Sequence, residues 1–116
     1  MTKNTKKIDT ALIGCGYWGT NIARTLINLK KCRLLVFDEN YSNSKILKSR
    51  FPKNIIIEKK INNLFKNDSI KNIILATPPM KNFILIKNAI KNKKNLFVEK
   101  PGLKNFSDIN KISKIK

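Results

Sequence analysis

The sequence predicts an α/β fold, a doubly wound parallel sheet with helices on both faces. Short apolar runs alternate along the chain with segments of helical periodicity, which is the pattern of repeated strand–helix–strand units. The runs are apolar at nearly every position, as expected of strands whose two faces are both buried. Most of the few glycines and prolines follow three of these runs, at the strand ends where open parallel sheets bind ligands.

Five strands and their connecting helices are expected in chain order. The strands are predicted at residues 8–13, 32–37, 54–58, 72–76 and 95–98. Helices are predicted at residues 17–29, 42–50, 62–66 and 81–91, with another from residue 105 onward. The first helix carries apolar residues at helical spacing, namely Ile22, Leu26 and Leu29. Right-handed crossovers then give the strand order 3-2-1-4-5, a sheet truncated before a sixth strand.

Length and hydropathy predict one domain, residues 8–116, preceded by a disordered basic segment, residues 1–7. No apolar run among the 116 residues is long enough to span a membrane, and the basic start lacks a signal-type segment. We therefore expect a cytoplasmic protein. Cys15 and Cys32 are expected to be reduced and buried rather than paired in a disulfide. A reactive Cys15 is the alternative, but the chain has no histidine to activate it.

The formal net charge of +18 raises the alternative of a nucleic-acid-binding protein. The lysines are spread along the chain instead of clustered, which fits solvated helix faces and loops. The two basic stretches, residues 2–7 and 91–94, contain no aromatic residues on which bases could stack. We expect weak, salt-sensitive attraction to polyanions and no specific nucleic-acid site.

The glycine loop, Gly14-Cys15-Gly16-Tyr17-Trp18-Gly19, follows a predicted strand and opens a predicted helix. In this context the G-x-G-x-x-G spacing predicts a dinucleotide phosphate site. Gly14 permits the tight turn, Gly16 lets the pyrophosphate approach the backbone, and Gly19 allows close helix packing. The helix N-terminus then offers N–H groups to the phosphates of NAD or NADP. A purely structural turn is the alternative.

Asp38 lies about 20 residues after the loop, at the end of the second strand, where a carboxylate accepts hydrogen bonds from the ribose of the cofactor. It would repel the extra phosphate of NADP, so Asp38 and Glu39 favour NAD; Lys45 keeps NADP open. An ordinary turn residue is the alternative for Asp38. Tyr17 and Trp18 either line the cofactor pocket or, the interpretation we favour, pack the start of the helix against neighbouring elements.

Two further motifs end the fourth and fifth strands, Ala76-Thr77-Pro78-Pro79 and Val98-Glu99-Lys100-Pro101. Together with the glycine loop they resemble the glucose-fructose oxidoreductase, inositol dehydrogenase and MocA family, over nearly the whole chain. The resemblance implies an N-terminal NAD(P)-binding Rossmann domain. It also implies that Thr77 and Pro78 border the cofactor, that Glu99 and Lys100 lie near the nicotinamide, and that Lys100 is catalytic. Without the family pattern, Glu99 and Lys100 could be a simple loop ion pair.

The sequence departs from this family in two respects. Asn82 stands where members often have a histidine, so any role of that histidine is in doubt. The family's second domain, which binds substrate and forms the homo-oligomer, has no counterpart here. We therefore expect a fragment, a truncated reading frame or one half of a split gene, not catalytically competent alone, with an aggregation-prone exposed sheet edge.

The expected function is that of the cofactor-binding part of an oxidoreductase. The complete enzyme would transfer hydride between a nicotinamide and the hydroxyl-bearing carbon of a sugar, nucleotide sugar or cyclitol. A stand-alone NAD-binding or sensing module acting through a partner is the alternative. No metal is expected, and the dinucleotide and a sugar-type substrate are the expected partners.

Overall fold

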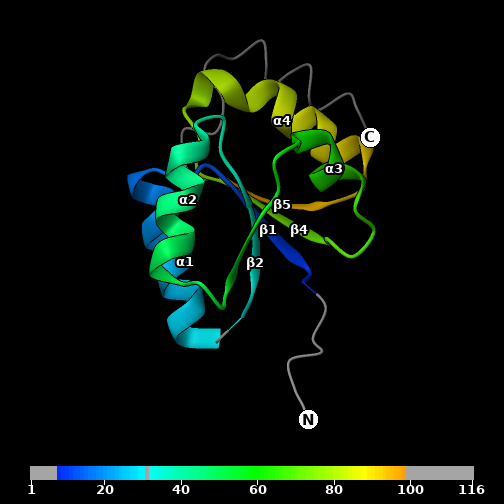
Figure 1. Ribbon diagram of the computed structural model, residues 1–116. Helices are drawn as coiled ribbons and strands as arrows, with labels where there is room; N and C mark the ends of the chain where they lie inside the picture. Colours follow the sequence, from blue (N-terminus) through cyan, green and yellow to red (C-terminus); the bar gives the residue numbers. More distant parts are fainter. Residues whose placement is uncertain (1–7, 31, 99–116) are drawn as a thin grey trace.

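The computed structural model describes residues 8–30 and 32–98. Five parallel strands form one sheet in the order β3-β2-β1-β4-β5, which confirms the predicted fold class and strand order (Figure 1). The elements follow one another as β1(Thr10–Ile13), α1(Tyr17–Lys30), β2(Leu34–Phe37), α2(Tyr41–Arg50), β3(Ile55–Ile57), α3(Ile61–Lys66), β4(Asn72–Leu75), α4(Pro79–Lys91) and β5(Asn95–Val98). The predicted segments 1–7 and 105 onward lie outside the described residues.

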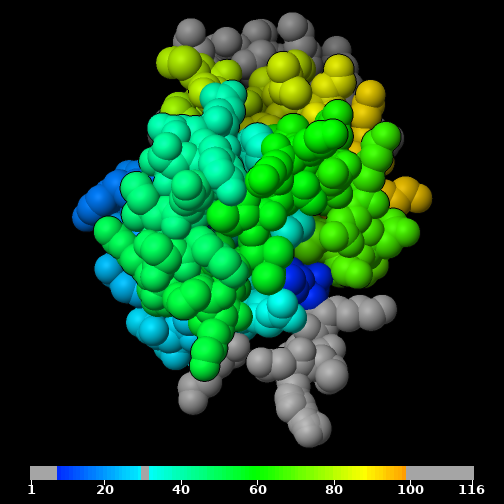
Figure 2. Space-filling model, viewed as in Figure 1, coloured from blue at the N-terminus to red at the C-terminus, as the bar shows by residue number. Residues whose placement is uncertain are grey.

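β1 is the centre of the fold, because it pairs with β2 on one side and with β4 on the other. Ala11 lies opposite Leu35 of β2 and Ile73 of β4, so the register joins three buried positions across the sheet. In the space-filling view β1, in blue, is almost wholly covered by other elements (Figure 2). Hence the residue that follows β1 leaves the sheet between the ends of two flanking strands.

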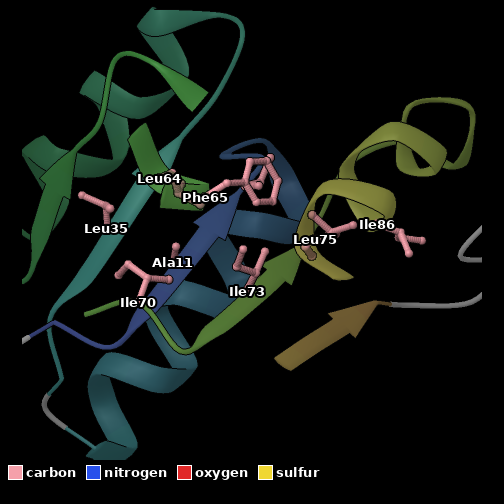
Figure 3. Packing of buried hydrophobic residues seen from close by; sticks show 10 residues of the cluster. Ala11, Leu35, Leu64, Phe65, Ile70, Ile73, Leu75 and Ile86 are labelled. Atoms are coloured by element: carbon pink, nitrogen blue, oxygen red, sulfur yellow. The ribbon is translucent and has the colours of Figure 1, made fainter. Parts of the chain in front are cut away.

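Two apolar layers cover the two faces of the sheet. Ala11 and Ile13 of β1 face the layer formed with α3 and α4, whose buried residues include Phe65 and Ile86 (Figure 3). Leu12 faces the opposite layer, formed with α1 and α2. This alternation is the period of two that a strand imposes on its side chains. Both strand faces are therefore buried at β1, as its apolar sequence predicts.

The first helix, predicted from the spacing of Ile22, Leu26 and Leu29, packs on the sheet through a narrow stripe. Ala23 and Ile27 are its buried residues, Ile22 and Leu26 are half-buried, and Leu29 is 74% exposed. The stripe centred on Ala23 and Ile27 brings the helix axis close to the sheet, since alanine has a small side chain. Of the three apolar residues at helical spacing, Leu29 is therefore the one that lies outside this stripe.

Most strands and helices begin or end within one or two residues of the predicted position. β1 begins at Thr10 because the carbonyl of Asp9 already accepts the N–H groups of Lys71 and Asn72 outside the ladder. α2 begins at Tyr41 because the Asn40 side chain accepts the N–H of Ser42 as an N-cap, 3.0 Å away.

No helix within residues 8–30 and 32–98 is long and apolar enough to cross a membrane. Neither Cys15 nor Cys32 is paired in a disulfide, as predicted; Cys15 is buried, whereas Cys32, also expected to be buried, is only half-buried.

Candidate dinucleotide site

The glycine loop occupies the carboxyl edge of the sheet between β2 and β4. The N–H of Gly14 donates to the Phe37 carbonyl at the end of β2, 2.8 Å away. On the other side the N–H of Ala76, after β4, donates to the Ile13 carbonyl, also 2.8 Å away. The loop is therefore tied to both strands that flank β1, at the position where an open parallel sheet binds its ligand.

Gly14 has a backbone conformation that only glycine adopts without strain. Its φ is +103°, and a Cβ built on it would lie 2.5 Å from the carbonyl oxygen of Ala76. Such a contact with backbone cannot be relieved by rotating a side chain. The turn after β1 thus requires glycine on two separate grounds, in agreement with the role predicted for Gly14.

Gly19 and Gly16 differ sharply in their surroundings. A Cβ on Gly19 would lie 1.8 Å from the carbonyl oxygen of Gly14, so the first turn of α1 is pressed onto the loop. A Cβ on Gly16 would have nothing within 4 Å. The space in front of Gly16 is open, and that is the space into which a pyrophosphate is expected to approach the backbone.

The start of α1 provides donors around this open space. The N–H of Thr20 donates to the Gly16 carbonyl at 2.9 Å, and the Thr20 hydroxyl donates to the Cys15 carbonyl at 3.2 Å. The N–H groups that precede Thr20 in the first turn have no acceptor within a helix. Together with the positive end of the helix dipole, they fit an anionic phosphate.

The Asp38 carboxylate accepts hydrogen bonds from two parts of the chain. Its carboxylate accepts the N–H of Cys15 at 2.7 Å, which holds the glycine loop against the end of β2. It also accepts the N–H of Asn40 at 2.8 Å and the side-chain amide of Asn43 at 3.3 Å, as a turn residue does. The turn interpretation and the placement beside the glycine loop are therefore both present in the structure.

Cys15 is shielded rather than reactive. Burial, and then the nearby Asp38 carboxylate, raise the pKa of its thiol to about 12. The Sγ atom lies 3.9 Å from the Phe37 carbonyl, to which it donates. A thiol that stays protonated at neutral pH is a poor nucleophile, so the prediction of a structural Cys15 fits its environment.

Tyr17 and Trp18 do not pack the helix start against neighbouring elements, which corrects the interpretation favoured above. Their side chains are 75% and 62% exposed, and their rings meet edge to face with centroids 5.2 Å apart. The two rings therefore contact each other at the start of α1 and are mostly exposed.

Thr77 joins the glycine loop to the start of α4. Its Cγ2 atom would lie 3.2 Å from a Cβ on Gly14, so the threonine borders the loop directly. Its hydroxyl donates to the side-chain carbonyl of Asn82, which is only 2% exposed. Pro78 is exposed and precedes α4, where its carbonyl accepts the N–H of Lys81 at 2.9 Å. Asn82 thus holds Thr77 in place through a hydrogen bond.

Glu99, Lys100 and Pro101 lie outside the described residues. Val98, the last residue of β5, pairs with Leu75, the last residue of β4. Both chain segments therefore leave the sheet at the same edge.

An ion pair that the sequence did not predict crosses this edge. Glu39, directly after Asp38, pairs with Lys81 in the first turn of α4. The two residues are 42 positions apart, and no local pattern in the sequence joins them. At the start of α2, the ammonium groups of Lys45 and Lys59 lie 5.7 Å and 5.3 Å from the ring centroid of Tyr41. Among the described residues no cluster of histidine, cysteine or carboxylate side chains could hold a metal.

Comparison with known proteins places this arrangement in context. The family model "Oxidoreductase family, NAD-binding Rossmann fold" (GFO_IDH_MocA) matches residues 8–115. No match was found among curated protein sequences.

Three solved structures illustrate the fold. UDP-N-acetylglucosamine 3-dehydrogenase GnnA from Acidithiobacillus ferrooxidans has a TM-score of 0.79 and 17% identity, over 96% of this chain and 35% of that one. The WlbA dehydrogenase from Bordetella pertussis, in complex with NADH and UDP-GlcNAcA, gives 0.81 and 16%, over 98% and 34%. Biliverdin reductase from Synechocystis sp. PCC 6803, in complex with biliverdin and NADP+, gives 0.81 and 14%, over 95% and 34%. The chain thus spans about a third of the length of these proteins, and the likeness is one of fold.

Proposed function

The chain belongs to the oxidoreductase family with an NAD-binding Rossmann fold, and from this we propose that it supplies the cofactor site of a sugar-type dehydrogenase. The complete enzyme would transfer hydride between the nicotinamide and the hydroxyl-bearing carbon of a sugar, nucleotide sugar or cyclitol. The nicotinamide carries the redox chemistry, and the protein supplies binding, orientation and electrostatics.

The observation that carries this proposal is the contrast among the three glycines of the loop. Gly14 and Gly19 are closed in by backbone, whereas Gly16 faces open space at a helix N-terminus. Among residues 8–30 and 32–98, no atom outside the neighbouring residues comes within 4 Å of a Cβ built on Gly16, so the position is not enclosed as Gly14 and Gly19 are. A pyrophosphate needs that space and the adjacent N–H groups.

The remaining site residues follow from their places around this space. Asp38 would accept a ribose hydroxyl, which favours NAD, while Tyr17 and Trp18 would border the cofactor. Thr77 and Pro78 would border it from the β4 side. These assignments fit the half-buried Asp38 beside the loop and the contact between Thr77 and Gly14.

Glu99 and Lys100 would act near the nicotinamide. A lysine close to a cationic ring can have its pKa lowered, so that its amine removes a proton from the substrate hydroxyl. We assign this role to Lys100. Glu99 would lie beside it, and Pro101 would shape the turn.

The sugar class of the substrate is supported by two structural neighbours. GnnA is named as a dehydrogenase of UDP-N-acetylglucosamine, and WlbA was solved with UDP-GlcNAcA. Biliverdin reductase shares the fold and acts on a different compound, so the fold alone does not select the substrate.

Isothermal titration calorimetry with NAD and NADP tests the cofactor site. We expect saturable binding of NAD by the wild-type chain and its loss in Gly16→Val, whose branched side chain would fill the open space. The matched control is Thr25→Val on the exposed part of α1, which should bind NAD as the wild type does. A chain that is folded by circular dichroism and binds neither dinucleotide would refute the proposal.

A further inference from the structure

Asn82 is a polar residue in the buried stripe of α4. The buried residues of this helix are Asn82, Ile86 and Ala89, which share one helix face because they are four and three positions apart. Ile86 and Ala89 belong to the apolar layer formed with α3. Burying an amide costs free energy unless it is hydrogen-bonded, so an amide in this stripe points to a hydrogen bond that the molecule uses.

One hydrogen bond of Asn82 fixes the orientation of Thr77. The Thr77 hydroxyl donates to the side-chain carbonyl of Asn82. The hydroxyl and the methyl group of a threonine are both attached to Cβ, so holding the Oγ1 atom also fixes the Cγ2 atom. That Cγ2 atom lies 3.2 Å from the position that a Cβ on Gly14 would take. Thr77 therefore turns its hydroxyl toward α4 and its methyl group toward the glycine loop.

The contact between Thr77 and Gly14 lies between two strands whose helices diverge. β1 and β4 are neighbours, but α1 packs on one face of the sheet and α4 on the other. In an open parallel sheet the ligand crevice opens between such strands, outside their carboxyl ends. Gly14 follows β1 directly, and Thr77 is the second residue after β4. A shift of the Thr77 side chain would therefore change the width of this crevice.

We propose that Asn82 is a positioning residue of the dinucleotide site. Through the Thr77 hydroxyl it fixes the side of the crevice that faces Gly14, and because Asn82 is buried it acts without contacting the cofactor. A site held in one conformation before binding loses less conformational entropy when the ligand arrives. The role needs a hydrogen-bond acceptor and no proton transfer, so an amide is sufficient. The inference rests on the proposed function and adds to it a residue that determines affinity from within α4.

A double-mutant cycle on NAD binding tests the coupling of Asn82 and Thr77. Asn82→Leu removes the acceptor at similar side-chain size, and Thr77→Val removes the donor while keeping the branched shape. Calorimetry should show that each single variant weakens NAD binding about three- to tenfold. The double variant should bind no more weakly than the weaker single variant, because both substitutions remove the same hydrogen bond. Additive losses would overturn the inference, since the two residues would then act separately.

Ala89→Gly is the matched control for a general loss of stability. It lies in the same buried stripe, about two turns beyond Asn82, and glycine lowers the helix propensity there. We expect its midpoint in urea to fall while its dissociation constant for NAD stays within about twofold of the wild type. The inference is overturned if Ala89→Gly weakens NAD binding as much as Asn82→Leu does.

The remaining outcomes separate this inference from the proposed function. If Asn82→Leu does not fold, Thr77→Val decides, and an unchanged affinity for NAD in that variant overturns the inference. Wild-type chain that binds NAD, together with folded single variants that bind it equally well, overturns this inference alone. Folded wild-type chain that binds no dinucleotide overturns the proposed function as well.

Discussion

Substituting the three loop glycines one at a time should separate binding from folding. Gly16→Ala places a methyl group in space that is empty to 4 Å, and the backbone at Gly16 is outside the left-handed region. Alanine is a poorer residue than glycine at the start of a helix, which costs up to about 1 kcal/mol. We therefore expect the free energy of unfolding to fall by no more than that.

Gly14→Ala, in contrast, should lower the free energy of unfolding strongly. Its φ of +103° costs a side-chain-bearing residue about 1–3 kcal/mol, and the new methyl group would overlap the Ala76 carbonyl at 2.5 Å. Moving that carbonyl also disturbs the neighbouring bond from the Ala76 N–H to Ile13. The sum should exceed about 3 kcal/mol, a large part of the stability of a domain this size. Gly19→Ala, with its 1.8 Å contact to backbone, should behave similarly.

Urea denaturation and NAD calorimetry on the same three variants check the reasoning. Gly16→Ala should remain folded while its dissociation constant for NAD rises about tenfold or more, which corresponds to about 1.4 kcal/mol. The reasoning fails if Gly16→Ala is as unstable as Gly14→Ala, because the new methyl group at Gly16 would then be in contact with other atoms. It also fails if Gly16→Ala binds NAD as tightly as the wild type, because the phosphate would then lie elsewhere.

Four other outcomes are expected. Iodoacetamide should alkylate the half-buried Cys32 well before Cys15, as mass spectrometry of the native protein can show; equal rates would contradict the shielding of Cys15. Because the pKa of Cys15 is raised from 9.0 to about 12 on folding, its contribution to stability is complete below about pH 9 and is lost as the pH rises toward 12. Cys15→Ala should therefore flatten alkaline denaturation curves, and an unchanged curve would contradict the shift. Asn82→Ala should lower stability by about 1–3 kcal/mol in thermal melts, since it leaves a buried cavity and removes the partner of the Thr77 hydroxyl; an unchanged melting temperature would contradict this. Leu12→Ala, at a fully buried position in β1, should cost about 2–5 kcal/mol, and a smaller loss would mean that the layer under α1 and α2 collapses into the space.

The sheet was predictable because its determinants are local. Each strand is an apolar run bounded by polar or turn residues, and parallel pairing with right-handed crossovers leaves few arrangements of five such strands. The places of Gly14, Gly16 and Gly19 were predictable for the same reason. The tight turn at Gly14, the pyrophosphate approach expected at Gly16 and the close helix packing at Gly19 all depend on the spacing of residues within one six-residue segment.

Features that depend on distant parts of the chain could not be predicted in this way. The pair of Glu39 and Lys81 depends on the distance between the ends of β2 and β4, which no sequence pattern encodes. Trp18 is mostly exposed although it is large and apolar, and Ala23 is buried whereas Leu29 is exposed. Which residues of α1 are buried depends on how the helix packs on the sheet, which its own sequence does not fix. In each case the packing of distant elements determines which of several similar residues is buried or paired.

The bond from the Cys15 N–H to Asp38 has a consequence for how such a domain changes its cofactor in evolution or by design. The carboxylate proposed to accept the ribose hydroxyl also holds in place the loop proposed to bind the phosphates. Exchanging it for a neutral or basic residue would remove that support and leave the amide of Cys15 without its acceptor. Substitutions at Glu39 and Lys81 carry no such burden, because neither side chain supports the loop. Substitutions at Asp38 that alter cofactor preference would therefore also weaken the support of the glycine loop, whereas substitutions at Glu39 would not.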